Sequence, residues 1–124
     1  MLTDCDLIAF APTSDTARAE AFYSGILGLA VVERSPFACV VRACNTMLRL
    51  TAVDVVTPAP FTILGWSVPD IRAAVRTLAD RGVELERYEG MGQDDNGVWT
   101  APSGDLVAWF RDPDANVLSL SQLT

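Results

Sequence analysis

The sequence contains no histidine among its 124 residues. This absence excludes Ser-His-Asp and Cys-His catalysis, and it removes the commonest side-chain ligand of transition metals. Long apolar runs are also missing, because no segment approaches the ~20 apolar residues that a membrane span needs. Residues 1–6 contain no basic stretch followed by an apolar one, so no secretory signal is visible. We therefore expect a cytoplasmic protein that does not cross a membrane.

Basic residues and cysteines are scarce as well. Nine Lys and Arg residues stand against 16 Asp and Glu residues, which gives a net charge of −7. Nucleic acids and anionic membranes bind to basic surfaces, so we expect neither as a partner. The three cysteines, Cys5, Cys39 and Cys44, are odd in number and form no CxxC pair, which disfavours a disulfide framework. We expect them to be buried, unreactive thiols.

The apolar pattern predicts the same order of elements twice. Asp15 and Asp70 are each a good helix N-cap before an apolar stripe at helical spacing, and Gly28 and Gly82 each follow the end of that stripe. Short apolar or alternating runs around these helices are typical of strands. The expected strands cover residues 5–11, 29–33, 37–43 and 46–53, then 62–68, 83–87, 106–111 and 117–120.

The spacing within the two halves also agrees. Seven residues separate Ile8 from Asp15, and seven separate Ile63 from Asp70. This indicates one strand–helix–three-strand unit used twice. We predict an α+β fold with a single domain over residues 1–124, made of a first module over about 1–55 and a second over about 61–124. Two such modules side by side, with helices on one face only, predict a trough suited to a small ligand.

Three segments resemble the motifs of one family. Residues 21–29 read AFYSGILGL, residues 65–71 read GWSVPDI and residues 109–116 read WFRDPDAN. In this order and spacing they are similar to motifs of the vicinal oxygen chelate superfamily, which includes glyoxalases, bleomycin resistance proteins and dioxygenases. The resemblance implies two βαβββ modules forming a cupped mixed sheet, and a homodimer. Ala115 stands where the family usually has glycine, which costs about 1 kcal/mol if the turn needs a positive φ.

The resemblance also indicates where catalytic relatives bind a divalent metal. Matched residue by residue, those positions are Ile8, Arg49, Ile63 and Ser119. A divalent ion needs imidazole, carboxylate or thiolate ligands, and an arginine repels it. We therefore expect no metal and no other cofactor. Glyoxalase-type isomerisation and extradiol ring cleavage are then not expected, because both depend on the Lewis acidity of the metal.

Strand alternation places Met47, Arg49 and Thr51 on one face, which the resemblance turns toward the trough. We interpret Arg49 as a possible anchor for a carboxylate, phosphate or enolate oxygen. Two other interpretations stay open: Arg49 pairs with a carboxylate at the rim of the core, or it points into solvent.

In the same register Trp109 and Arg111 share one strand face. An indole beside a cation suits a conjugated ligand. The alternative is that Trp109 simply packs in the core. Trp66 has the opposite parity and is expected under the helices. Trp99 follows the glycine-rich loop 90–97, which is either a lid or a simple connection. The complete set of expected ligand-binding residues is Arg49, Trp109, Phe10, Met47, Trp99, Arg111 and Ser119.

The leading functional hypothesis is a metal-free binding protein of the bleomycin-resistance type, which holds a small planar or anionic organic ligand. The alternative is a metal-independent isomerase, epimerase or lyase acting on a small carbonyl compound. That enzyme needs an Asp, Glu, Cys or Tyr as general base, and Tyr23 or a carboxylate next to Arg49 would favour it. The sequence assigns no catalytic residue. A third class, a structural or regulatory partner, would be favoured if the chain's own side chains filled the trough.

Overall fold

The chain divides between Thr57 and Pro58 in the computed structural model, which describes residues 1–124. Unit one, Met1–Thr57, contains β1 (Ile8–Thr13), α1 (Thr16–Glu20), the π-helix η1 (Ala21–Ile26), β2 (Ala30–Arg34), β3 (Ala38–Ala43) and β4 (Thr46–Ala52). Unit two, Pro58–Thr124, contains β5 (Thr62–Ser67), α2 (Ile71–Asp80), β6 (Trp99–Thr100), β7 (Leu106–Arg111) and β8 (Val117–Gln122).

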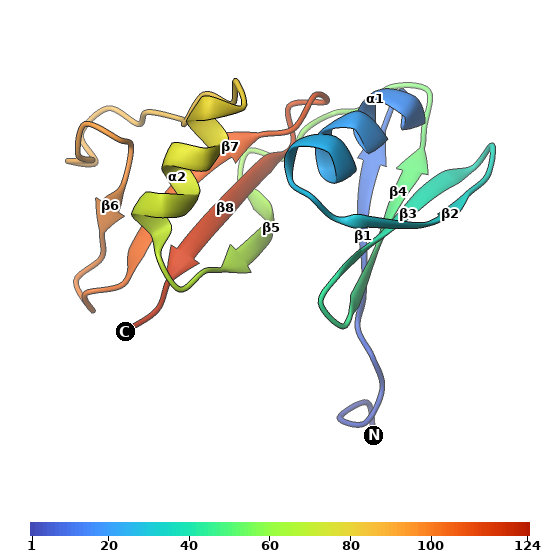
Figure 1. The fold of residues 1–124 in the computed structure, drawn as a ribbon, viewed down its shortest axis with the longest axis horizontal. Coiled ribbons are helices and arrows are strands. Elements are labelled where there is room, and N and C mark those ends of the chain that lie inside the picture. Colours follow the sequence, from blue (N-terminus) through green and yellow to red (C-terminus); the bar gives the residue numbers. More distant parts are fainter. The chain divides into compact units, whose positions relative to one another are not determined.

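Both units have the same topology (Figure 1). The strand order is β1-β4-β3-β2 in unit one and β5-β8-β7-β6 in unit two. In each sheet the first pair is parallel and the other two pairs are antiparallel. The predicted α+β fold of two βαβββ modules is therefore confirmed, with one four-stranded mixed sheet in each unit.

The predicted helix ends are also confirmed. The Asp15 carboxylate accepts a hydrogen bond from the Arg18 backbone N–H at 3.1 Å, and the Asp70 carboxylate accepts one from the Ala73 N–H at 3.1 Å. Each bond satisfies one of the N–H groups that a helix start leaves without a partner. Gly28 and Gly82 have φ angles of +80° and +86°, which glycine adopts without steric cost.

The first helix differs from the sequence-based expectation in its second half. Residues Ala21–Ile26 form a π-helix, and the Leu27 N–H donates to the Phe22 carbonyl five residues earlier at 2.9 Å. The wider turn brings the adjacent aromatic residues Phe22 and Tyr23 into the core together, since both are buried. Apolar spacing alone does not distinguish this winding from an α-helix.

Two predicted strands are misplaced. The first begins at Ile8 instead of Cys5 and continues through Pro12, because β1 is an edge strand and a proline there removes no ladder hydrogen bond. The expected strand 83–87 is wrong: only Leu85 forms a bridge, with Phe110. The Gln93 side chain accepts from the Tyr88 N–H and donates to the Glu86 carbonyl, and so satisfies backbone groups that a longer strand would pair.

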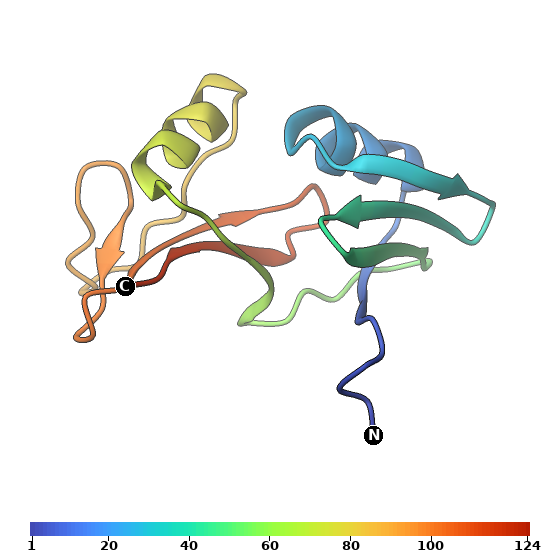
Figure 2. The same cartoon turned by 60° about the horizontal axis from the view of Figure 1, so that its bottom comes forward.

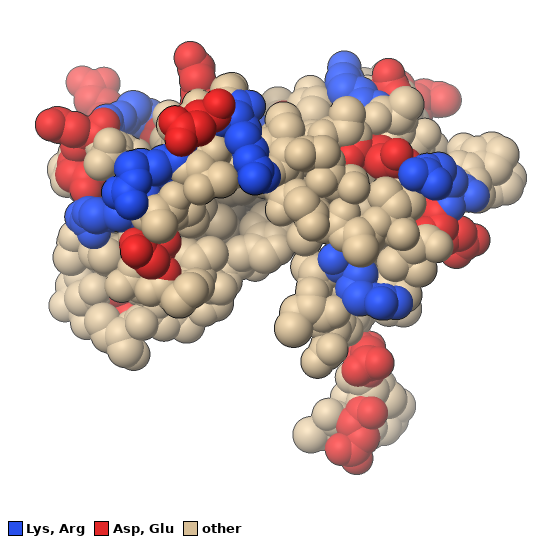
Figure 3. Space-filling view, viewed as in Figure 1, with Lys and Arg blue, Asp and Glu red and all other residues tan.

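Each sheet has its helix on one face (Figure 2). In unit one the covered face is packed with Phe22, Tyr23, Leu48 and Leu50, all of them buried. In unit two the corresponding core contains Phe110 and Leu118 of the sheet and Ile71, Val75 and Leu78 of α2. None of the helices has the length and apolar character that crossing a membrane requires. Acidic and basic side chains are intermixed on the surface that Figure 3 shows.

Candidate functional site

The face of the unit-one sheet that carries no helix is defined by strand register. Phe10, Arg49 and Val40 lie side by side on β1, β4 and β3, and Ile8, Met47 and Arg42 form the next row. We call these six residues, together with Thr51, the helix-free face of unit one. Leu48 and Leu50 point to the helix side and are buried, as strand alternation requires. Arg49, Phe10 and Met47 are thus brought together on one surface, as expected from the sequence.

The Arg49 side chain is half-buried and makes no hydrogen bond or ion pair. Other arginines differ: Arg34 pairs with Glu20 at 2.6 Å and Arg72 with Asp94 at 3.0 Å. The cross-strand neighbours of Arg49 are Phe10 and Val40, neither of which accepts a hydrogen bond through its side chain. A guanidinium in such surroundings has lost part of its hydration without gaining a counter-charge. It can hold a carboxylate through two parallel hydrogen bonds.

Thr51 lies two residues along the same strand face from Arg49. Its Oγ1 is the one buried side-chain oxygen or nitrogen without a hydrogen-bond partner. Buried polar atoms nearly always have a partner, so an unpaired one calls for an explanation such as a water or a ligand atom. Two polar groups on one strand face therefore lack partners.

The helix-free face of unit two carries a different row. Gly65, Ser119 and Trp109 lie side by side on β5, β8 and β7, followed by Ser67, Ser121, Val107 and Trp99. We call these seven residues the helix-free face of unit two. Trp66 is in register with Leu120 and Ala108 on the opposite face, as expected. Ser119 is 9% exposed and its hydroxyl has no hydrogen-bond partner within the chain.

Two aromatic rings, those of Tyr88 and Trp99, pack against Trp109. The Tyr88 ring packs edge-to-face against it, with centroids 5.4 Å apart and planes at 82°. The Trp99 ring lies 6.0 Å away at 38°. Trp109 remains half-buried despite both contacts. Tyr88 could not be predicted from the sequence, because it falls between an expected strand and a polar loop and no periodic pattern includes it.

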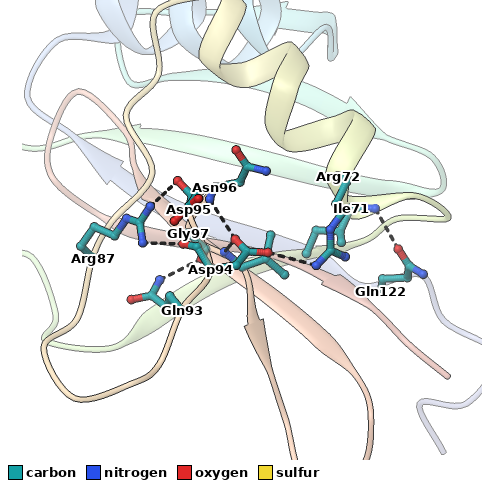
Figure 4. A network of polar contacts seen from close by, with 10 residues as sticks. Ile71, Arg72, Arg87, Gln93, Asp94, Asp95, Asn96, Gly97 and Gln122 are labelled. Carbon is teal, nitrogen blue, oxygen red and sulfur yellow. Dashed lines mark hydrogen bonds and ion pairs between the residues drawn. The ribbon is translucent and has the colours of Figure 1, made fainter.

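The loop between Tyr88 and Trp99 is held by a polar network (Figure 4). The Asp94 carboxylate accepts from the backbone N–H groups of Asn96 and Val98 and pairs with Arg72 of α2. Although burial raises the pKa of Asp94, these hydrogen bonds and the Arg72 charge outweigh burial and lower the pKa overall. Arg87 donates to the carbonyls of Asp94 and Asp95. This network fits the connection interpretation of the loop, since it fixes the chain that carries Tyr88 and Trp99.

Arg111, another expected ligand-binding residue, already has partners. Its guanidinium pairs with the Glu86 carboxylate and donates to the Ala115 carbonyl at 2.8 Å. Both contacts hold β7 to neighbouring loops. Arg111 is therefore less available to an anion than Arg49.

A second group of reactive side chains lines a cleft of about 280 Å³ in unit one, beside α1. The Arg34 hydrogen bond lowers the pKa of Glu20, and the Cys39 thiol donates to the Glu20 carboxylate at 3.6 Å. Burial, then the Glu20 charge, raises the pKa of Cys39. The expectation of buried thiols holds for Cys39 but is wrong for Cys5 and Cys44, which are exposed in the N-terminal segment and the β3–β4 turn.

The positions implied as metal ligands carry no suitable donors. Arg49 and Ile8 lie on the helix-free face of unit one, and Ser119 lies on that of unit two. Across the chain, no three His, Cys, Asp or Glu side chains lie close enough together to hold a metal ion. Tyr23 is buried in the helix-side core, and no carboxylate reaches Arg49, so no general base stands next to it.

The sequence matches the model of the Glyoxalase/Bleomycin resistance protein/Dioxygenase superfamily over residues 7–120. The chain belongs to this family. No curated protein matches it.

Solved structures share the whole fold with this family member. A member of the same superfamily from Sphaerobacter thermophilus DSM 20745 has a TM-score of 0.76 at 24% identity, covering 98% of this chain and 99% of that chain. An antibiotic binding protein from Streptomyces sp. CB03234 has a TM-score of 0.74 at 23% identity, covering 100% and 99%. Lactoylglutathione lyase from Agrobacterium tumefaciens has a TM-score of 0.74 at 17% identity, covering 96% and 93%. At these identities the similarity concerns the fold.

Proposed function

We propose that this chain is a metal-free ligand-binding member of its family, which holds a small anionic or planar organic molecule against the helix-free face of unit one. The observation that carries the proposal is Arg49, a half-buried guanidinium without a hydrogen bond or ion pair. A buried charge ordinarily has a partner, because its removal from water otherwise costs several kcal/mol. An anionic group of the ligand supplies that partner.

The absence of a metal from the proposal follows from side-chain chemistry. At the positions where the resemblance implies ligands, this chain has two aliphatic side chains, a guanidinium and a neutral hydroxyl. These groups do not fit a divalent ion. A binding role is consistent with the similarity to an antibiotic binding protein, whereas the enzyme alternative lacks a base beside Arg49.

Equilibrium dialysis with 2-naphthoate tests the Arg49 assignment. Arg49→Gln is expected to weaken binding by about tenfold or more, since a charge-assisted hydrogen bond contributes roughly 1.5–3 kcal/mol. Arg76→Gln makes the same change in net charge at an exposed position of α2, and we expect less than about a twofold effect, as for an exposed charge without a ligand. Equal affinities of the wild type and Arg49→Gln, or no binding by the wild type, would contradict the assignment.

The same titration after dialysis against EDTA tests the metal-free part of the proposal. We expect an unchanged affinity for 2-naphthoate, because the binding groups are a guanidinium and apolar side chains. A loss of binding that added Zn²⁺ or Mn²⁺ restores would show that the ligand is held through a metal.

We also propose that the chain forms a homodimer, as the family resemblance implies. Three of its five phenylalanines are mostly exposed: Phe10 at 61%, Phe37 at 73% and Phe61 at 65%. Burial of such rings between two copies of the chain would remove apolar surface from water and stabilise a dimer. Sedimentation equilibrium distinguishes a dimer from the 13.4 kDa monomer.

A further inference from the structure

The Ser119 hydroxyl is positioned to receive a ligand. Ser119 is nine-tenths buried, and its Oγ has no partner within the chain. The Oγ atom still has some surface open to solvent. The only side-chain polar atom that is both fully buried and unpaired is Thr51 Oγ1, so the unpaired Ser119 Oγ is not fully buried. A serine hydroxyl can donate one hydrogen bond and accept two, so this group has its full capacity available.

The Ser119 hydroxyl lies against the backbone of Gly65, in the place that a side chain there would take. A Cβ atom built at Gly65 would lie 2.7 Å from Ser119 Oγ, closer than real Cβ contacts allow. The strand register places Gly65 on one side of Ser119 and Trp109 on the other. Adjacent strands lie about 4.8 Å apart, so the bare backbone, the hydroxyl and the indole follow one another at that spacing.

Aromatic rings lie next to Ser119, on the side away from Gly65. Trp109 is flanked by Tyr88 and Trp99, and the Asp94 network holds the loop that connects these two rings. Aromatic rings attract a further flat ring through stacking or edge-to-face contacts. The only arginine of this sheet face, Arg111, is already paired with Glu86. A ligand group that meets Ser119 is therefore neutral.

We infer that Trp109, Trp99, Tyr88, Ser119 and Gly65 form a subsite for a flat aromatic ring that bears a neutral hydroxyl or carbonyl at its edge. The ring packs against Trp109, and its edge oxygen bonds to Ser119 Oγ, which lies where it does because Gly65 has no side chain. This inference rests on the proposed function, that the chain binds small molecules, and names the class of ring that the helix-free face of unit two binds by itself.

Equilibrium dialysis with 2-naphthol and naphthalene tests the subsite, because the two probes differ only in the hydroxyl. Wild-type protein is expected to bind 2-naphthol about fivefold more tightly than naphthalene, which corresponds to one neutral hydrogen bond. Ser119→Ala should reduce this preference to less than about twofold while leaving naphthalene binding intact. Gly65→Ala should also reduce it, because the new Cβ displaces the Ser119 hydroxyl.

Gly25→Ala is the matched glycine control, since a Cβ at Gly25 meets nothing within 4 Å. It should leave the preference unchanged. Trp109→Leu should weaken both probes alike, and thermal unfolding of each variant verifies that it is folded.

The outcomes separate the two proposals. Binding of both naphthalene and 2-naphthol with equal affinity, or an unchanged preference in Ser119→Ala, overturns the subsite and leaves the Arg49 assignment standing. Failure of the wild type to bind 2-naphthol, naphthalene and 2-naphthoate overturns both.

Discussion

The two units carry side chains of different size at equivalent positions of their two sheets. Phe10, Arg49 and Val40 in unit one occupy the row that Gly65, Ser119 and Trp109 occupy in unit two. The edge strand carries the Phe10 ring in unit one and only Gly65 in unit two. In contrast, β3 of unit one carries the small Val40 where β7 of unit two carries the Trp109 ring. One topology thus presents a cation between apolar groups on one face and a hydroxyl beside an indole on the other. Chemistry in this fold is set by a few side chains and not by the backbone.

The helix-side faces differ in the same manner. Val41 and Phe110 occupy matched positions, opposite Leu48 and Leu118, and both are fully buried. Unit one compensates for its smaller sheet residue with Phe22 and Tyr23 from η1. Unit two takes its large ring from the sheet and packs Val75 and Leu78 of α2 around it.

The largest expected effect comes from removing the buried ring of the unit-two sheet. Phe110→Ala should lower the free energy of unfolding by about 3–5 kcal/mol through lost burial and a cavity. Val41→Ala, the matched change in unit one, should cost about 2 kcal/mol because it removes two methyl groups. Urea denaturation followed by circular dichroism measures both losses.

All three tryptophans lie in unit two, so their fluorescence reports on that unit alone. Coincident fluorescence and circular dichroism transitions would allow the two losses to be compared directly. Similar losses in Phe110→Ala and Val41→Ala would contradict the assignment of different core roles to the two sheets.

The two principal ion pairs, Asp94–Arg72 and Glu20–Arg34, are expected to differ in their contribution to stability, by less than the two core residues do. Asp94 accepts two backbone N–H groups besides its Arg72 partner, whereas Glu20 accepts from the side chains of Arg34 and Cys39. Asp94→Ala should therefore cost about 1 kcal/mol, as loss of a helix cap does. Glu20→Ala should cost clearly less than Asp94→Ala, because Arg34 is mostly exposed and water screens the pair.

Asp95→Ala is the control for Asp94→Ala, since the neighbouring carboxylate makes no hydrogen bond. Thermal unfolding of the three variants measures the order of effects. An Asp95→Ala loss as large as that of Asp94→Ala would show that the loop network does not depend on the Asp94 contacts.

These carboxylates also give stability a pH dependence. The pKa of Asp94 and the pKa of Glu20 both lie below their ordinary values of 3.8 and 4.5 in the folded chain. Their contribution is therefore present above those values and is lost as the pH falls through the folded pKa. We expect unfolding midpoints to fall in acid below these ordinary values, with a shallower fall in Asp94→Asn when tryptophan fluorescence is followed.

The smallest expected effects concern the hairpin turns. Ala115 and Cys44 have φ angles of +66° and +53°, in the turns β7–β8 and β3–β4. Replacing either with glycine should stabilise the chain by up to about 1 kcal/mol, because glycine adopts a positive φ without strain. Thermal unfolding measures the gain, and destabilisation by both substitutions would contradict the strain argument.

Much of the fold could be predicted because local chemistry decides it. Asp15 and Asp70 cap the two helices and Gly28 and Gly82 follow their ends, as predicted, and strand alternation correctly placed Arg49 with Met47 on one face. The π-helix at Ala21–Ile26 and the loss of the strand 83–87 could not be predicted. The first depends on how two adjacent rings enter the core, and the second on one glutamine side chain eight residues beyond Leu85.

The candidate site could be predicted only in part for the same reason. Arg49, Trp109 and Ser119 follow from register, which sequence periodicity carries. The position of Tyr88 depends on a loop path, and the contact of Ser119 Oγ with Gly65 depends on the orientation of one serine hydroxyl. The engagement of Arg111 with Glu86 was equally invisible, because the two residues are 25 positions apart.

The most direct test of the central claim is an NMR titration of the arginine Nε–H resonances with 2-naphthoate. The Arg49 resonance is assigned by its absence from Arg49→Gln, and that of Arg76 from Arg76→Gln. We predict that the Arg49 signal shifts in a saturable manner while the Arg76 signal does not move. Equal, non-saturating shifts of all exposed arginines, or no shift at Arg49, would contradict the assignment of Arg49 as the anion anchor.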